Sequence, residues 1–143
     1  MVKRNVIDVL IGAVLAFLSQ IIQYGAYLLG LVMRLPFAYE SAPEDPGSHP
    51  EWLAQINLMM LLSALPVFVL AFVAARVVKV PEAGEGLRSG LIWAAVVVLW
   101  HLLVGLGNGT LAMFGTPGLW AFFAAFVLGP VVAGWLGQRQ PVR

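Results

Sequence analysis

The stretch from Ile7 to Met33 constrains this chain most, because it carries no charged residue after Asp8. At about 1.5 Å per residue, a helix of this length crosses the roughly 30 Å hydrocarbon core of a bilayer. Two glutamines, Gln20 and Gln23, lie inside it. Because an amide without a hydrogen-bonding partner in lipid costs several kcal/mol, such residues must face protein. The stretch therefore predicts a membrane-spanning helix with one side turned toward its neighbours.

Steps of about 100° per residue divide this helix into two unlike faces. The small and polar residues, which we expect to face protein, are Gly12, Ala13, Ala16, Gln20, Gln23, Tyr24 and Tyr27. The aliphatic residues, which we expect to face lipid, are Ile11, Val14, Leu15, Leu18, Ile22 and Leu29. The sequence thus predicts how the first helix is rotated about its own axis.

Composition extends this prediction to the whole chain. Of its 143 residues 61% are hydrophobic and only 10% are charged, whereas roughly a quarter are charged in a soluble domain. Four apolar stretches are long enough to span a bilayer, at about residues 6–32, 53–79, 87–107 and 117–137. We therefore expect an all-α polytopic membrane protein, in which residues 1–143 form a single four-helix transmembrane domain.

The distribution of basic residues predicts the orientation in the membrane. With this helix count, all of them except Arg34 fall on one side, namely Lys3, Arg4, Arg76, Lys79, Arg88, Arg139 and Arg143. The loop on the opposite side, residues 34–52, carries Arg34 and four acidic residues. Lys and Arg mark the cytoplasmic side, so we expect a multi-pass protein of the cell membrane with both termini cytoplasmic. A net charge of +1 gives no reason to expect a nucleic-acid partner.

The loop of residues 34–52 is rich in proline and acidic residues. Ser48 and Glu51 have the spacing of a capping box, which predicts a helix start near His49. A histidine beside carboxylates raises the alternative of a metal site. The residues lack the spacing of a metal-binding loop, so we interpret the segment as a solvated loop and expect no metal.

The third apolar stretch resembles the first in having one small and polar face. Its residues are Gly90, Ala94, Val97, His101, Gly105 and Asn108. The run Gly107-Asn108-Gly109-Thr110 tolerates left-handed backbone angles and predicts the end of this helix. Thr116 then provides a cap, and Pro117 the first position, of the fourth helix.

The fourth stretch carries the clearest packing signal, a small residue at every fourth position. The residues of this ladder are Ala121, Ala125, Gly129, Ala133 and Gly137. Such a ladder lets two helix backbones approach closely, and its partner is either another helix of this chain or a second subunit. Phe122, Phe123 and Phe126 lie away from the start of the ladder, so we expect them to face lipid or a partner.

Polar residues of the first three helices converge in the outer half of the predicted bundle. One interpretation is that they hydrogen-bond one another and hold the helices together. The other is an outward-opening ligand pocket, because an ionisable residue at membrane depth is a candidate site. Its lining would be Gln20, Gln23, Tyr24, Tyr27, Asn57, Trp100 and His101.

Catalytic chemistry finds little support in the sequence. There is no cysteine, and Asp8 is predicted at the inner end, far from His101. The two histidines lack a metal-binding spacing. We expect no enzyme activity and no cofactor.

The leading hypothesis is a small protein that acts by helix association, as an accessory subunit of a membrane complex or as a homo-oligomer. The alternative is a small transporter, channel or apolar-ligand binder that uses the outer pocket.

Overall fold

The computed structural model describes residues 2–33 and 43–138, and these are almost entirely helical. The long helices are α1 (Val2–Met33), α2 (Pro50–Val77), α3 (Ala83–Asn108) and α4 (Pro117–Gln138). Two short 3-10 helices, η1 (Pro46–Ser48) and η2 (Leu111–Gly115), precede α2 and α4. Within the described residues, four helices are long and apolar enough to span a membrane. The prediction of four helices long and apolar enough to span a membrane is therefore confirmed.

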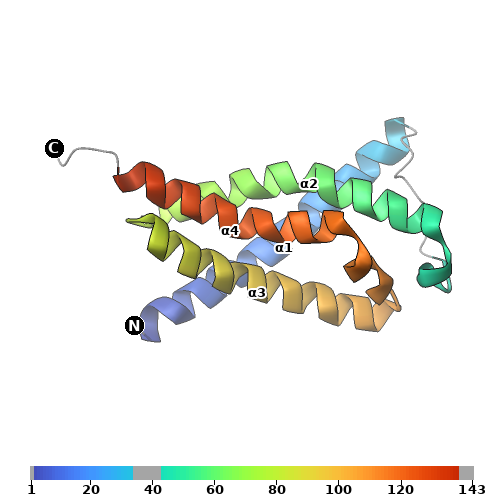
Figure 1. The fold of residues 1–143 in the computed structure, drawn as a ribbon, viewed down its shortest axis with the longest axis horizontal. Helices are drawn as coiled ribbons and strands as arrows, with labels where there is room; N and C mark the ends of the chain where they lie inside the picture. The colour runs from blue at the N-terminus through green and yellow to red at the C-terminus, as the bar shows by residue number, and fades with distance from the viewer. Residues whose placement is uncertain (1, 34–42, 139–143) are drawn as a thin grey trace.

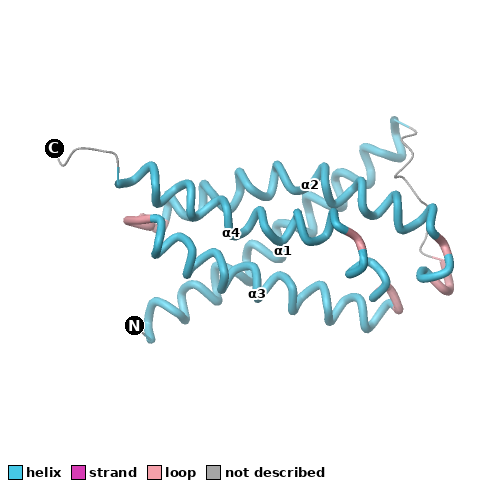
Figure 2. Tube along the Cα trace, in the orientation of Figure 1, coloured by secondary structure: helices cyan, strands magenta, loops and turns pink. Residues whose placement is uncertain are grey.

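Helices α2, α3 and α4 run alongside one another, whereas α1 crosses them obliquely (Figure 1). α4 packs against both α2 and α3, and α1 packs against α3 and α2. The start of α1, the link between α2 and α3, and the end of α4 lie at one end of the bundle (Figure 1). The non-helical segments lie at the ends of the bundle (Figure 2). We call the end that holds the start of α1 the inner end, and the opposite end the outer end.

The phenylalanines of α4 fill the centre of the bundle. Phe122 and Phe126 are 0% exposed and Phe123 is 4% exposed. The expectation that these three rings face lipid or a partner was wrong. Because α4 has α2 on one side and α3 on another, its large side chains and its small ones both meet protein. The rings of Phe122 and Phe126 pack edge to face, with centroids 5.5 Å apart.

The small-residue ladder of α4 meets α2 within the chain. A β-carbon added at Gly129 would lie 2.7 Å from the backbone nitrogen of Phe72 and 2.9 Å from the carbonyl oxygen of Phe68. Ala125 and Ala133 are buried as well. Gly137, at the end of the ladder, lies beside the link between α2 and α3, with Pro81 O 3.3 Å from the position of an added β-carbon. The closest backbone approach in the ladder, at Gly129, is therefore a contact with α2.

The ends of the helices follow the sequence in part. α3 ends at Asn108, and Gly109 follows with φ +68°, as the glycine-rich run predicts. α4 begins at Pro117 as predicted. Its second residue, Gly118, donates its backbone N–H to Asn57 Oδ1 at 2.6 Å. A side chain of α2 therefore satisfies an amide at the start of α4 that has no partner within its own helix.

The predicted capping box of α2 does not form. α2 begins at Pro50, one residue later than expected, and Ser48 belongs to η1. The Ser48 hydroxyl donates to Asp45 O at 2.9 Å, so it is occupied by its own turn. The Glu51 carboxylate instead contacts the His49 ring, 2.9 Å from Nδ1.

α1 is rotated relative to the predicted orientation. Leu15, expected in lipid, is 2% exposed, and Ala13, expected to face protein, is exposed. Gly12 is the point of contact with α3, since an added β-carbon would lie 3.1 Å from Val96 Cβ. Because α1 crosses α2 and α3 obliquely, Leu15 faces these helices and is buried. The buried residues of this helix are Asp8, Gly12, Leu15, Ala16, Ser19, Gln23 and Gly30.

A single methyl group at Gly129 should separate α4 from α2. We expect Gly129→Ala to lower the free energy of unfolding by about 1–3 kcal/mol, because the backbone of α2 has no room to yield. The measurement is thermal unfolding of the purified protein in detergent. Gly25→Ala is the matched control, because a β-carbon at Gly25 meets nothing within 4 Å. A Gly129→Ala protein as stable as the Gly25→Ala protein would contradict the packing described here.

Candidate functional site

Two glutamines of α1 meet one histidine of α3 in the interior of the bundle. Gln23 Nε2 lies 3.1 Å from His101 Nε2, and Gln20 Nε2 lies 3.3 Å from the same atom. His101 is 3% exposed and Gln23 is 8% exposed. The sequence predicted that these three residues share a protein-facing surface, and the structure brings them into direct contact. We call Gln20, Gln23 and His101 the outer polar cluster.

The hydrogen bonds around the imidazole assign its protonation. His101 Nδ1 lies 2.9 Å from Val97 O, and because a carbonyl only accepts, Nδ1 carries the hydrogen. Amide nitrogens only donate, so Nε2 accepts from both Gln20 and Gln23. With both amide nitrogens facing Nε2, this pairing requires the neutral tautomer that carries its hydrogen on Nδ1, and the acceptor nitrogen is shared between two donors. The glutamine amides and the histidine nitrogen thus give one another hydrogen-bonding partners in apolar surroundings, where an unpaired polar group would be costly.

Aromatic rings of α4 enclose the other side of the imidazole. The ring centroids of Phe122 and Phe123 both lie 5.4 Å from that of His101, and both rings meet it edge on. The outer polar cluster thus joins α1 to α3 and rests on α4. Apolar walls lower the local dielectric, which strengthens the hydrogen bonds within the cluster and raises the cost of breaking them.

The other residues predicted for the pocket lie elsewhere. Tyr24 is 63% exposed and Trp100 is 43% exposed, so both point outward. Tyr27 is half-buried and stacks on Tyr24, with ring centroids 6.3 Å apart. Asn57 serves as the acceptor for the start of α4. Because α1 crosses the bundle obliquely (Figure 1), residues just beyond Gln23 leave the interior that their helical spacing had suggested.

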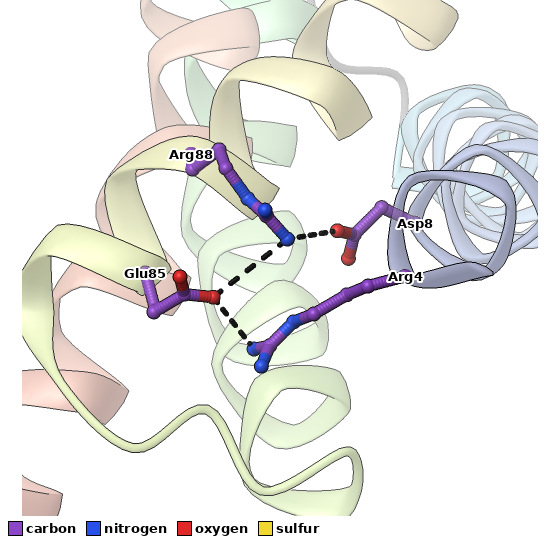
Figure 3. Close-up of polar contacts among 4 residues, drawn as sticks. All are labelled: Arg4, Asp8, Glu85 and Arg88. Carbon is purple, nitrogen blue, oxygen red and sulfur yellow. Dashed lines mark hydrogen bonds and ion pairs between the residues drawn. The ribbon is translucent and has the colours of Figure 1, made fainter. Parts of the chain in front are cut away.

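A second polar contact, which the sequence analysis missed, fastens α1 to α3 at the inner end (Figure 3). Arg4 Nη2 lies 3.0 Å from Glu85 Oε2. Arg88 Nη2 lies 3.7 Å from the same oxygen and 3.4 Å from Asp8 Oδ2. The Asp8 side chain is only 4% exposed. We call Arg4, Asp8, Glu85 and Arg88 the inner ion-pair network.

The sequence did contain a signal for this network. Arg4 and Asp8 are one turn apart on α1, and Glu85 and Arg88 are one turn apart on α3, so each pair shares a helix face. Both pairs lie at the inner ends of apolar helices, where charged residues of parallel neighbours meet. Pairing is what allows the Asp8 carboxylate to be buried, since an isolated charge there is very costly.

The geometry of the outer polar cluster limits what it can do chemically. Its acceptor nitrogen is already bonded to two amides, so a ligand that binds there must displace one of them. The neighbouring Ser19 hydroxyl donates to Ala16 O at 2.8 Å within its own helix. In the arrangement described, the cluster attaches α1 to α3. It can bind a ligand only after one of the two glutamine side chains moves away from His101.

Comparison of the chain with protein-family models, with curated proteins and with solved structures finds no match. The arguments about its function consequently depend on its own residues.

The coupling between Gln23 and His101 should be measurable. We compare Gln23→Leu, His101→Phe and the double variant by unfolding in detergent. Each single change leaves a polar partner unpaired, whereas the double change removes both, so the double variant should lose less stability than the sum of the single losses. The expected coupling is about 0.6 kcal/mol and at most about 1.7 kcal/mol. Strict additivity would contradict the contact.

Proposed function

We propose that this chain is a non-catalytic, multi-pass protein of the cell membrane that acts by associating with another membrane protein or with further copies of itself. Four apolar helices are compatible with a small integral membrane protein. The association role is proposed because of the way in which α1 is attached to the rest of the bundle.

The orientation that we propose has both termini in the cytoplasm. Four basic residues lie near the inner end. Arg4 is at the start of α1 and Arg76 at the end of α2, whereas Lys79 is in the link and Arg88 is near the start of α3. These segments all lie at the same end of the bundle (Figure 1). Basic residues mark the cytoplasmic side of a membrane protein. The inner ion-pair network neutralises part of this charge but leaves Arg76 and Lys79 exposed.

The observation that carries the association role is the bare outer side of α1. One side of this helix is fastened to α3 by the inner ion-pair network and the outer polar cluster. The opposite side presents large apolar side chains with alternating spacings of four and three residues, all more than 40% exposed, namely Leu10, Val14, Phe17, Ile21, Tyr24 and Leu28. This spacing is the one along which a second helix packs knobs into holes.

This stripe replaces the ladder of α4 as the candidate contact with a partner. Gly129, at the centre of the ladder, is in contact with α2, so this position is not available to a helix of another chain. An 18-residue apolar stretch of α1 is 28% buried, against 33% for α2, 33% for α3 and 50% for α4. A partner helix on α1 would raise that fraction without any change in the other three helices.

A second candidate function, a transporter, channel or apolar-ligand binder, draws on the outer polar cluster. Its support is the convergence of Gln20, Gln23 and His101, which is the part of the predicted pocket that comes together. A ligand with a hydrogen-bond donor would compete with the two amides for His101 Nε2. Under this function, His101→Ala or Gln20→Leu abolishes binding or flux while the fold survives.

Native mass spectrometry of the protein extracted in mild detergent distinguishes the two functions. If α1 is the contact, the intact particle contains a second copy or another membrane protein, and the double variant Phe17→Ala, Ile21→Ala releases it. The matched control is Leu65→Ala, Leu103→Ala, which removes exposed leucines from α2 and α3. Because the changed side chains lie on the surface, both variants should remain folded.

Two results would contradict the association role. One is a particle that contains a single chain at every protein concentration. The other is an assembly that the α1 variant leaves intact and the control variant disrupts. A single chain that carries a small molecule, lost in His101→Ala, would support the second candidate function instead.

A further inference from the structure

An apolar groove runs between α1 and α2 in the inner half of the bundle. Its cavity volume is about 310 Å³. The lining residues are Leu10, Ile11, Val14, Leu15, Leu18, Leu70, Val73 and Ala74. From Leu10 to Leu18 the groove follows α1 for about 12 Å at 1.5 Å per residue. Its position between two helices and its uniformly aliphatic lining suit a hydrocarbon chain.

A cavity with charged walls lies beside the inner end of the groove. This second cavity is lined by Arg4, Ile7, Asp8, Ile11 and Val78, and Ile11 also lines the groove. The two spaces therefore lie next to each other, with Ile11 on the wall of both. We call the second cavity the charged mouth. Among its lining residues on α1, Arg4 is nearest the inner end, and Asp8 lies one turn closer to the groove, about 6 Å along the helix.

The two charged side chains of the mouth offer different hydrogen-bonding groups. The Arg4 guanidinium is 41% exposed and uses one nitrogen, Nη2, for Glu85, so it retains donors for an anion. Among the side chains that the structure describes, Asp8 pairs with Arg88 alone, through Oδ2. In Figure 3 no contact with the drawn residues is marked at the other oxygen of Asp8. That oxygen can accept a hydrogen bond from a ligand.

We propose that the groove and the charged mouth bind a phospholipid with a single acyl chain and a free glycerol hydroxyl, that is, a lysophospholipid. Arg4 binds the phosphate, the hydroxyl donates to Asp8, and the acyl chain lies in the groove. The order of these groups along the ligand, from phosphate to hydroxyl to hydrocarbon, is the order of Arg4, Asp8 and the groove along α1.

The hydroxyl is what distinguishes this ligand from an ordinary membrane phospholipid. In a diacyl lipid the same position carries an ester, which has no hydrogen to donate and would set its oxygens against the Asp8 carboxylate. A hydroxyl satisfies that carboxylate instead. The deep position of Asp8 between the phosphate site and the groove therefore selects the lyso form. The inference rests on the membrane placement proposed above, because it needs the mouth at the level of lipid headgroups.

The test is binding of monopalmitoyl lysophosphatidic acid to the purified protein in detergent, followed by native mass spectrometry. Arg4→Gln should weaken binding about tenfold, which corresponds to one hydrogen bond to a charged group. Val73→Phe should block the groove. Val69→Phe is its matched control, since both valines are 50% exposed on α2 and only Val73 lines the groove.

Two analogues test the role assigned to Asp8. Dipalmitoyl phosphatidic acid and the monopalmitoyl analogue without the glycerol hydroxyl should both bind about tenfold more weakly than lysophosphatidic acid. Equal binding of either analogue, or a Val73→Phe protein that binds as well as Val69→Phe, would overturn the proposal. Recovery of the same variants in the membrane fraction of cells tests the membrane placement separately. A wrong membrane placement can therefore be told apart from an absence of lipid binding.

Discussion

The pairing of Gln20 and Gln23 with His101 is the constraint on which the position of α1 depends. In the proposed membrane placement, the surrounding hydrocarbon offers an amide nothing to bond with, so these glutamines must find a partner inside the protein. His101 Nε2 accepts from both of them at 3.1 and 3.3 Å, and its Nδ1 is satisfied by Val97 O. Because one acceptor serves two donors on successive turns of α1, the rotation of that helix is determined at this level.

The molecule divides its packing between two kinds of contact. α4 meets α2 and α3 through glycines and buried phenylalanines, which bring backbones close and fill the space beside them. α1 meets α3 through polar contacts at two levels, with Gly12 between them, and adds Leu15 and Ala16 to the hydrophobic core. α1 is consequently held on one side and bare on the other. The proposed association along Phe17, Ile21, Tyr24 and Leu28 in the outer half, and the proposed lipid groove beside Leu10 and Val14 in the inner half, both follow from this arrangement.

Hydropathy and the cost of unpaired amides were sufficient to predict four helices and the approach of both glutamines to His101. They were insufficient for contacts that depend on how whole helices cross. Leu15 and Phe122 are as apolar as side chains that face outward, and only the oblique path of α1 and the central position of α4 bury them. Asn57 was assigned to the pocket because of its depth, and its actual partner, Gly118, depends on where η2 places the start of α4.

The measurement that tests this account most directly is a spin-label scan of α1 in bilayers, made with single cysteines at positions 17 to 24. The chain has no cysteine of its own, so each label reports one position. In bilayers in which the purified chain is diluted to single copies, so that no partner covers α1, collision with oxygen dissolved in the lipid should be frequent at Phe17, Ile21 and Tyr24 and rare at Ser19 and Gln23. The reverse pattern, with Gln23 open to lipid and Ile21 protected, would contradict the claim that lipid forces the glutamines inward.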